Sequence, residues 1–122
     1  MATILVVEDE FGIAEVLQSA LTDAGHDVVI AINGKQGLER LKETRPDLVI
    51  LDFMMPVLDG PSMLREMKRT PEFSSIPVML MSSLPQSTVM QEAGGKYDGF
   101  LRKPFRLTIV LEMVNSFVDQ AG

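Results

Sequence analysis

Cysteine is absent from this chain of 122 residues, so disulfides, thiolate metal sites and cysteine nucleophiles are excluded. Long apolar runs are lacking too: none approaches the length of a membrane span, and no basic stretch followed by an apolar one opens the chain. The net charge of −6 argues against direct contact with nucleic acid, because phosphate recognition needs clustered Lys and Arg. We therefore expect a cytoplasmic protein with neither a membrane nor nucleic acid as partner.

Histidine occurs once, as His26. It lies in the polar stretch "DAGHDV", where we expect a solvated loop residue without a functional role. The composition is otherwise that of a globular protein, with 46% hydrophobic and 23% charged residues. A chain of this length can bury a core of its own, so we expect residues 1–122 to form a single domain.

Short apolar runs alternate with amphipathic segments along the chain. The apolar runs predict strands at 3–7, 27–32, 47–52, 76–83 and 99–103. The periodic segments predict helices at 13–24, 34–43, 61–69, within 84–95 and at 107–118, the second of them capped by Asn33. Strands and helices in alternation predict a three-layer α/β fold, in which helices cover both faces of a parallel sheet.

Charged and hydroxyl side chains follow the ends of four of these strands. Glu8 and Asp9 follow the first, Asp52 ends the third, Ser82 lies at the end of the fourth and Lys103 at the end of the fifth. Because α/β folds of this kind bind ligands outside the carboxyl ends of their strands, we expect these groups to converge on one edge of the sheet.

The three acids would form an all-oxygen pocket suited to Mg²⁺, whose charge would offset the repulsion between adjacent carboxylates. Asp52 follows four apolar residues, and a fixed carboxylate can attack phosphorus to give an acyl phosphate. Phosphoryl transfer depends mainly on positioning and charge neutralisation, which Mg²⁺, Lys103 and the Ser82 hydroxyl could share among the phosphoryl oxygens. Taken singly, the acids of "EDE", Ser82 and Lys103 are also compatible with solvated strand ends, and the functional interpretation rests on their joint arrangement.

Four blocks of the sequence, "ILVVEDE", "PDLVILDFMMPVLDG", "IPVMLMSS" and "FLRKPF", resemble the receiver domain of two-component response regulators in order and spacing. The resemblance covers essentially the whole chain. It implies a flavodoxin-like, doubly wound (βα)5 fold with a five-stranded parallel sheet of order 2-1-3-4-5. It also implies a cis bond between Lys103 and Pro104.

The resemblance further implies a role for each matching residue. Asp52 would be the phosphoacceptor, assisted by Lys103 and Ser82. The Mg²⁺ ligands would be Asp9 directly, Glu8 mainly through water, Asp52 and the backbone carbonyl of Met54. Ser82 and Phe100 would form the conformational switch.

By the same resemblance, a sensor histidine kinase or histidine phosphotransfer protein would donate a phosphoryl group to Asp52, and the receiver would catalyse its own phosphorylation. Ser82 would then move inward and Phe100 would rotate, which would change the face formed by the fourth helix, fifth strand and fifth helix. That face would control an unknown output protein or effector domain. We expect a monomer or weak homodimer.

Three departures from the family pattern lead to further expectations. The spacing between Ser82 and Lys103 and the stretch "EAGGKYDGF" predict a short or displaced fourth helix followed by a longer loop. Apolar residues stand two positions after Asp52 and Ser82, as Met54 and Leu84, which predicts slow self-dephosphorylation. The stripe of Phe105, Ile109 and Met113 fits either a broad core face or a partner-binding patch.

Other functions fit less of the sequence. A haloacid-dehalogenase-like phosphatase would carry a second Asp two residues after the first, where this chain has Met54. An FMN carrier would need a phosphate cradle after the first strand, and "EDEFG" would repel a phosphate. A pseudo-receiver that binds partners without chemistry is the remaining alternative.

Overall fold

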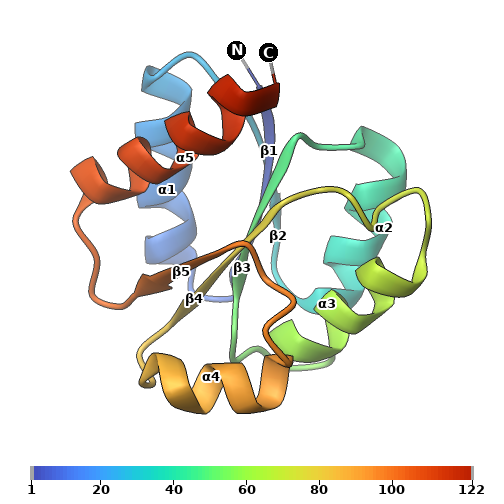
Figure 1. The fold of residues 1–122 in the computed structure, drawn as a ribbon. Helices are drawn as coiled ribbons and strands as arrows, with labels where there is room; N and C mark the ends of the chain where they lie inside the picture. The colour runs from blue at the N-terminus through green and yellow to red at the C-terminus, as the bar shows by residue number, and fades with distance from the viewer. Residues whose placement is uncertain (1, 122) are drawn as a thin grey trace.

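The computed structural model describes residues 2–121, with strands and helices in strict alternation (Figure 1). The strands are β1 Thr3–Val7, β2 Asp27–Ala31, β3 Leu48–Asp52, β4 Val78–Ser82 and β5 Gly99–Arg102. The helices are α1 Phe11–Asp23, α2 Gly34–Thr44, α3 Gly60–Arg69, α4 Gln86–Ala93 and α5 Leu107–Ala121. All strand pairs are parallel, in the order β2-β1-β3-β4-β5. The predicted α/β fold and strand order are confirmed.

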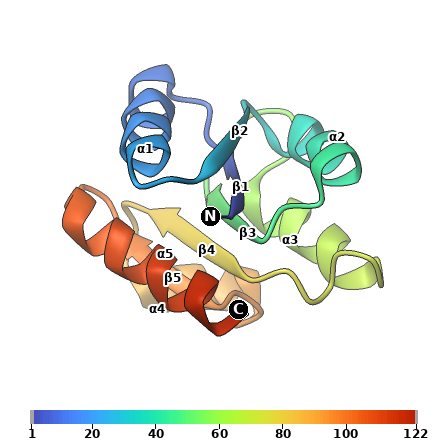
Figure 2. The same cartoon turned by 90° about the horizontal axis from the view of Figure 1, so that it is seen from above.

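The core has two halves because successive strand residues point to opposite faces of the sheet. Leu5 and Val7 belong to a cluster that includes Leu41 of α2 and Met63 of α3, whereas Ile4 and Val6 belong to one that includes α1 and α5 residues. Figure 2 shows this layering, with the sheet between α1 and α5 on one side and α2 and α3 on the other. The continuous apolar runs of β1, β3 and β4 follow from this double coverage.

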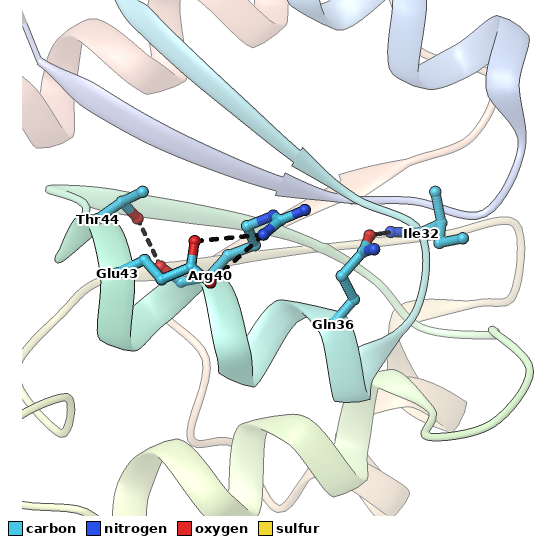
Figure 3. Close-up of polar contacts among 5 residues, drawn as sticks. All are labelled: Ile32, Gln36, Arg40, Glu43 and Thr44. Atoms are coloured by element: carbon cyan, nitrogen blue, oxygen red, sulfur yellow. Dashed lines mark hydrogen bonds and ion pairs between the residues drawn. The ribbon is translucent and has the colours of Figure 1, made fainter.

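Helix α2 begins with a polar network that fixes its first turn. Asn33 accepts a hydrogen bond from the Gln36 backbone N–H at 2.8 Å, as the sequence predicts. The Gln36 side chain in turn accepts from the Ile32 N–H at 2.8 Å (Figure 3). Further along, Arg40 pairs with Glu43. The start of α2 is therefore firmly located relative to the end of β2.

Helix α4 has eight residues and ends at Gly94, whose φ is 69°. Five residues, 94–98, then lead to β5. The expectation of a short fourth helix followed by a loop is confirmed. Glycine suits this end because left-handed backbone carries little penalty without a Cβ.

The prediction for His26 is wrong. Its side chain is buried, and Nδ1 accepts a hydrogen bond from the Ala2 backbone N–H at 3.2 Å. The residue therefore supports the start of β1 instead of lying in solvent. Polar neighbours in sequence were misleading because the turn between α1 and β2 lies against Ala2, whose carbonyl accepts from the Asp27 N–H at 2.9 Å.

The apolar stripe on α5 is not uniformly buried. Phe105, which lies two residues before α5 begins, and Met113 are half-buried and pack against the core, whereas Ile109 is 43% exposed. A broad core face alone does not account for Ile109. Among the residues described, no helix is long and apolar enough to cross a membrane.

Candidate functional site

The predicted site residues do meet at the carboxyl edge of the sheet. The backbone hydrogen bonds of the sheet continue one residue past the ends of β1 and β5 and so fix two of the site residues at this edge. Glu8 N–H donates to the Ala31 carbonyl at 2.9 Å, and Lys103 N–H donates to the Ser82 carbonyl at 2.8 Å. Asp52, the last residue of β3, pairs in register with Met81 of β4. The side chains are thus positioned by sheet geometry and not by flexible loops.

Lys103 connects two buried carboxylates from different strands. Its Nζ lies 2.7 Å from Glu8 Oε1 and 3.1 Å from Asp52 Oδ1. The Glu8 side chain is fully buried and that of Asp52 is 7% exposed. Buried charges are tolerated when they are paired in this way.

One lysine does not fully satisfy these acids. Burial raises the pKa of the Glu8 carboxyl from 4.5 to about 7, although hydrogen bonds from Lys103 and from the Glu10 backbone N–H favour its ionised form. Burial also raises the pKa of Asp52, against the charge of Lys103. For Lys103, burial acts to lower the pKa, but the hydrogen bond to Glu8 and the charge of Asp52 outweigh it and raise the pKa. The pocket therefore favours additional positive charge.

The acids have the donor set of a hard-cation site. Glu8, Asp9 and Asp52 each offer a carboxylate oxygen, and these oxygens lie within 4.8 Å of one another. Asp9 is exposed, so the cluster opens to solvent on one side. Oxygen ligands with access to water suit Mg²⁺, which keeps several waters when bound to protein. The residues present fit this ion.

A cavity of about 330 Å³ lies beside these groups, lined by Glu10, Asp52, Met54, Ser82, Ser83 and Lys103. Ser82 is buried, and its Oγ accepts a hydrogen bond from the Leu84 N–H at 3.0 Å. Met54 is 63% exposed at the cavity. The cavity therefore combines a carboxylate, an ammonium and a hydroxyl group in a space of limited size.

Phe100, the expected switch residue, lies apart from the cavity lining and is half-buried. Its ring centroid lies 6.4 Å from that of Tyr97, in a tilted arrangement. The Tyr97 hydroxyl is buried and, within residues 2–121, has no hydrogen-bond partner. The bond between Lys103 and Pro104 is cis, as expected.

Sequence reasoning missed the backbone contacts that hold the loop between β3 and α3. Gly60 N–H donates to the Phe53 carbonyl at 3.1 Å, and Gly34 N–H of α2 donates to the Leu58 carbonyl at 2.9 Å. Val57, within this loop, has a φ of 69°. Gly34 and Gly60 were visible in the sequence as the first glycine of "NGKQG" and the glycine of "LDG". Their hydrogen-bond partners, however, depend on the tertiary fold.

Comparison with known proteins places the chain in a family. The family model of the response regulator receiver domain matches residues 4–115. The chain therefore belongs to the receiver domain family of two-component response regulators, proteins of signal transduction.

Relatives at the level of sequence are longer proteins. The uncharacterized transcriptional regulatory protein YkoG of Bacillus subtilis is 36% identical over 98% of this chain and 52% of its own length. The DNA-binding dual master transcriptional regulator RpaA of Synechocystis is 30% identical over 97% of this chain and 49% of its own. The chain thus spans about half the length of such relatives.

Solved structures of receiver domains superpose closely. The receiver domain of the Francisella response regulator 1452 gives a TM-score of 0.91 at 26% identity, with both chains fully covered. The Vibrio cholerae chemotaxis protein CheY4 gives a TM-score of 0.89 at 26% identity, over 96% of this chain and 98% of the other. The flavodoxin-like (βα)5 assignment is confirmed.

Proposed function

We propose that Asp52 accepts a phosphoryl group from the phosphohistidine of a sensor histidine kinase or histidine phosphotransfer protein, in a reaction that depends on Mg²⁺. The observation that carries this proposal is the pairing of Lys103 with both Glu8 and Asp52 beside a cavity that also contains Ser82. Ionisable groups whose pKa values are shifted by burial and by a specific charge partner, and that lie beside a cavity, are candidates for a functional site.

In the proposed reaction a carboxylate oxygen of Asp52 forms a bond to phosphorus. The bond between phosphorus and the donor imidazole nitrogen breaks, and the imidazole leaves with the electron pair. Lys103 neutralises charge on Asp52 and on the transferred group, and the Ser82 hydroxyl donates to a phosphoryl oxygen. Asp9, Asp52, the Met54 carbonyl and, mainly through water, Glu8 would hold Mg²⁺, which would supply the further positive charge that phosphoryl transfer requires.

The phosphorylated state would then be transmitted and removed slowly. Ser82 would leave its hydrogen bond with the Leu84 N–H, and the side chain of Phe100, on β5, would rotate. The face formed by α4, β5 and α5 would change as a result and would control an output protein or effector domain. Met54 and Leu84 offer no polar side chain to orient a hydrolytic water, which supports a long phosphoryl lifetime.

We further propose that residues 1–122 act as a single domain in the cytoplasm, as a monomer or weak homodimer.

The test is intact mass after incubation with acetyl phosphate, with and without Mg²⁺. We expect an adduct of one phosphoryl group that requires Mg²⁺ and is lost in Asp52→Asn. Asp27→Asn, which changes an exposed acid at the start of β2, is the matched control and should keep the adduct. An unmodified wild-type protein under every condition would instead support the pseudo-receiver alternative.

A further inference from the structure

The loop between β3 and α3, residues 53–59, carries the Met54 carbonyl and contains an unusual turn. The Leu58 N–H donates to the Pro56 carbonyl at 2.8 Å, and the residue between them, Val57, has a φ of 69°. This is a three-residue γ-turn of the rarer form with positive φ. A β-branched residue is strained there, so surrounding contacts must hold the turn in place.

Those contacts come from α2, a separate element. The turn directs the Leu58 carbonyl onto Gly34, whose N–H donates to it at 2.9 Å. A Cβ on Gly34 would lie 2.4 Å from this carbonyl oxygen, so the approach depends on glycine. The first turn of α2 is itself fixed by Asn33 and Gln36 and is therefore a firm support.

The end of the loop at α3 also lies close to backbone atoms, those at the end of β3. Gly60 N–H closes the loop on the Phe53 carbonyl, and a Cβ on Gly60 would lie 2.4 Å from the Asp52 carbonyl oxygen. Phe53 N–H donates to the Met81 carbonyl of β4 at 2.8 Å. The segment that carries Met54 is thus held at its base by β4 and at its far side by α2.

We propose that Gly34 and the Val57 turn act together as positioning residues for the magnesium site: their contact through Leu58 fixes the loop that presents the Met54 carbonyl. The inference rests on the proposed function, because it takes that carbonyl and the acids as the ligands. Neither Gly34 nor Val57 belongs to the acid cluster or the cavity lining. Groups that orient a metal ligand without touching the ion affect affinity strongly.

The experiment measures the Kd of Mg²⁺ for the unphosphorylated full chain by isothermal titration calorimetry with MgCl2. In Gly34→Ala the new methyl group displaces the Leu58 carbonyl, and we expect the Kd to rise about tenfold. Val57→Pro disturbs the loop from within. Proline fixes φ near −65° and so abolishes the turn, and the side chain that it replaces is exposed. We expect a similar rise in Kd for this variant.

Gly37→Ala is the matched control. It lies on the same helix, and its Cβ would lie 2.7 Å from Met63 Sδ, so it also disturbs the packing of α2, but against a side chain and away from the loop. We expect its thermal midpoint to fall while its Kd for Mg²⁺ stays that of the wild type. An equal rise in Kd for Gly37→Ala and Gly34→Ala would overturn the inference in favour of general loosening.

The two proposals fail in distinguishable ways. If the wild type binds Mg²⁺ and both Gly34→Ala and Val57→Pro bind it with unchanged Kd, the positioning role is overturned and the phosphoacceptor function stands. If the wild type does not bind Mg²⁺, the metal site itself is overturned, and the positioning role with it. Folding of each variant is checked by circular dichroism. If one of the two loop variants does not fold, the Kd of the other decides.

Discussion

The two ends of the β-sheet use acidic side chains in opposite ways. At the amino ends, Asp47 Oδ2 accepts from the Thr3 N–H at 2.8 Å, and Asp98 Oδ2 accepts from the Val78 N–H at 2.9 Å. At the carboxyl ends, Glu8 and Asp52 share one lysine and lie close to Asp9. Acids at the amino edge complete the backbone hydrogen bonding of neighbouring strands, whereas those at the carboxyl edge retain unsatisfied negative charge.

The difference separates acids that complete the hydrogen bonding of the sheet from acids that gather at the candidate site. A side chain that pairs with a backbone N–H of the sheet has its role fulfilled within the chain. Clustered carboxylates with raised pKa values have not, and such clusters concentrate at functional sites. Changes at the two edges should therefore have different consequences.

The largest effect on stability is expected at the carboxyl edge, from Lys103→Met. Removing the ammonium leaves Glu8 and Asp52 buried without a cation, which should lower the free energy of unfolding by about 3 kcal/mol at pH 8 without Mg²⁺. Urea denaturation measures this loss. The exposed Lys96 provides the control, since Lys96→Met should change stability by less than about 0.5 kcal/mol. Equal effects of the two variants would contradict the comparison.

A pH dependence of comparable size is expected from Glu8. Its folded-state pKa of about 7 lies above the ordinary 4.5, so the stability contributed by its protonated form is fully present below pH 4.5 and is lost as the pH rises through 7. The difference from Glu8→Gln, which cannot titrate, should change by on the order of 3 kcal/mol over this window. Saturating Mg²⁺ should flatten the difference because a cation favours the ionised carboxyl. A flat difference without Mg²⁺ would be inconsistent with the raised pKa.

At the amino edge, His26→Ala should lower stability without affecting chemistry. The substitution leaves the buried Ala2 N–H without its acceptor, at a cost of about 1–2 kcal/mol. Thermal or urea unfolding measures the loss, while the yield of phosphoryl adduct at 10 °C, where the variant stays folded, should match the wild type. A variant with reduced adduct but normal stability would show that the two edges are not independent.

The smallest effect should be a gain, from Val57→Gly. Glycine relieves about 1–2 kcal/mol of strain at positive φ but adds about 0.5–1 kcal/mol of backbone entropy to the unfolded chain. A net stabilisation of about 0.5 kcal/mol is expected, measured by urea denaturation. Ile32→Gly, at another exposed apolar position near the same edge, is the control and should give no gain. A clear loss of stability in Val57→Gly would show that the backbone of Val57 is not strained.

Much of this architecture could be predicted because its causes are local. The apolar run 47–52 must be a buried strand, and β3 begins one residue later, at Leu48, although Asp47 already contacts Thr3 through both its backbone N–H and its side chain. Helix α1 begins at Phe11, two residues before the predicted start at Ile13, since Ala14 N–H already donates to the Glu10 carbonyl. Sequence periodicity marks the buried face of a helix and not its ends.

The site was predictable as a set of side chains but not as a set of contacts. Strand order, once known, brings Glu8, Asp52 and Lys103 to one edge. The burial of His26 and the contact between Gly34 and Leu58 depend on how neighbouring elements dock, for which no local pattern exists. The exposed Ile109 shows the same limit, because periodicity cannot tell how wide the covered face of a helix is.

The ion pair between Lys103 and Glu8 joins residues 95 positions apart. During synthesis, Glu8 and Asp52 leave the ribosome long before Lys103, and contacts of such sequence separation form late because loop closure precedes them. A chain that lacks β5 therefore contains the acids without their cation. The cavity that we propose for phosphoryl transfer becomes complete only when the last strand joins the sheet, because Lys103 follows that strand.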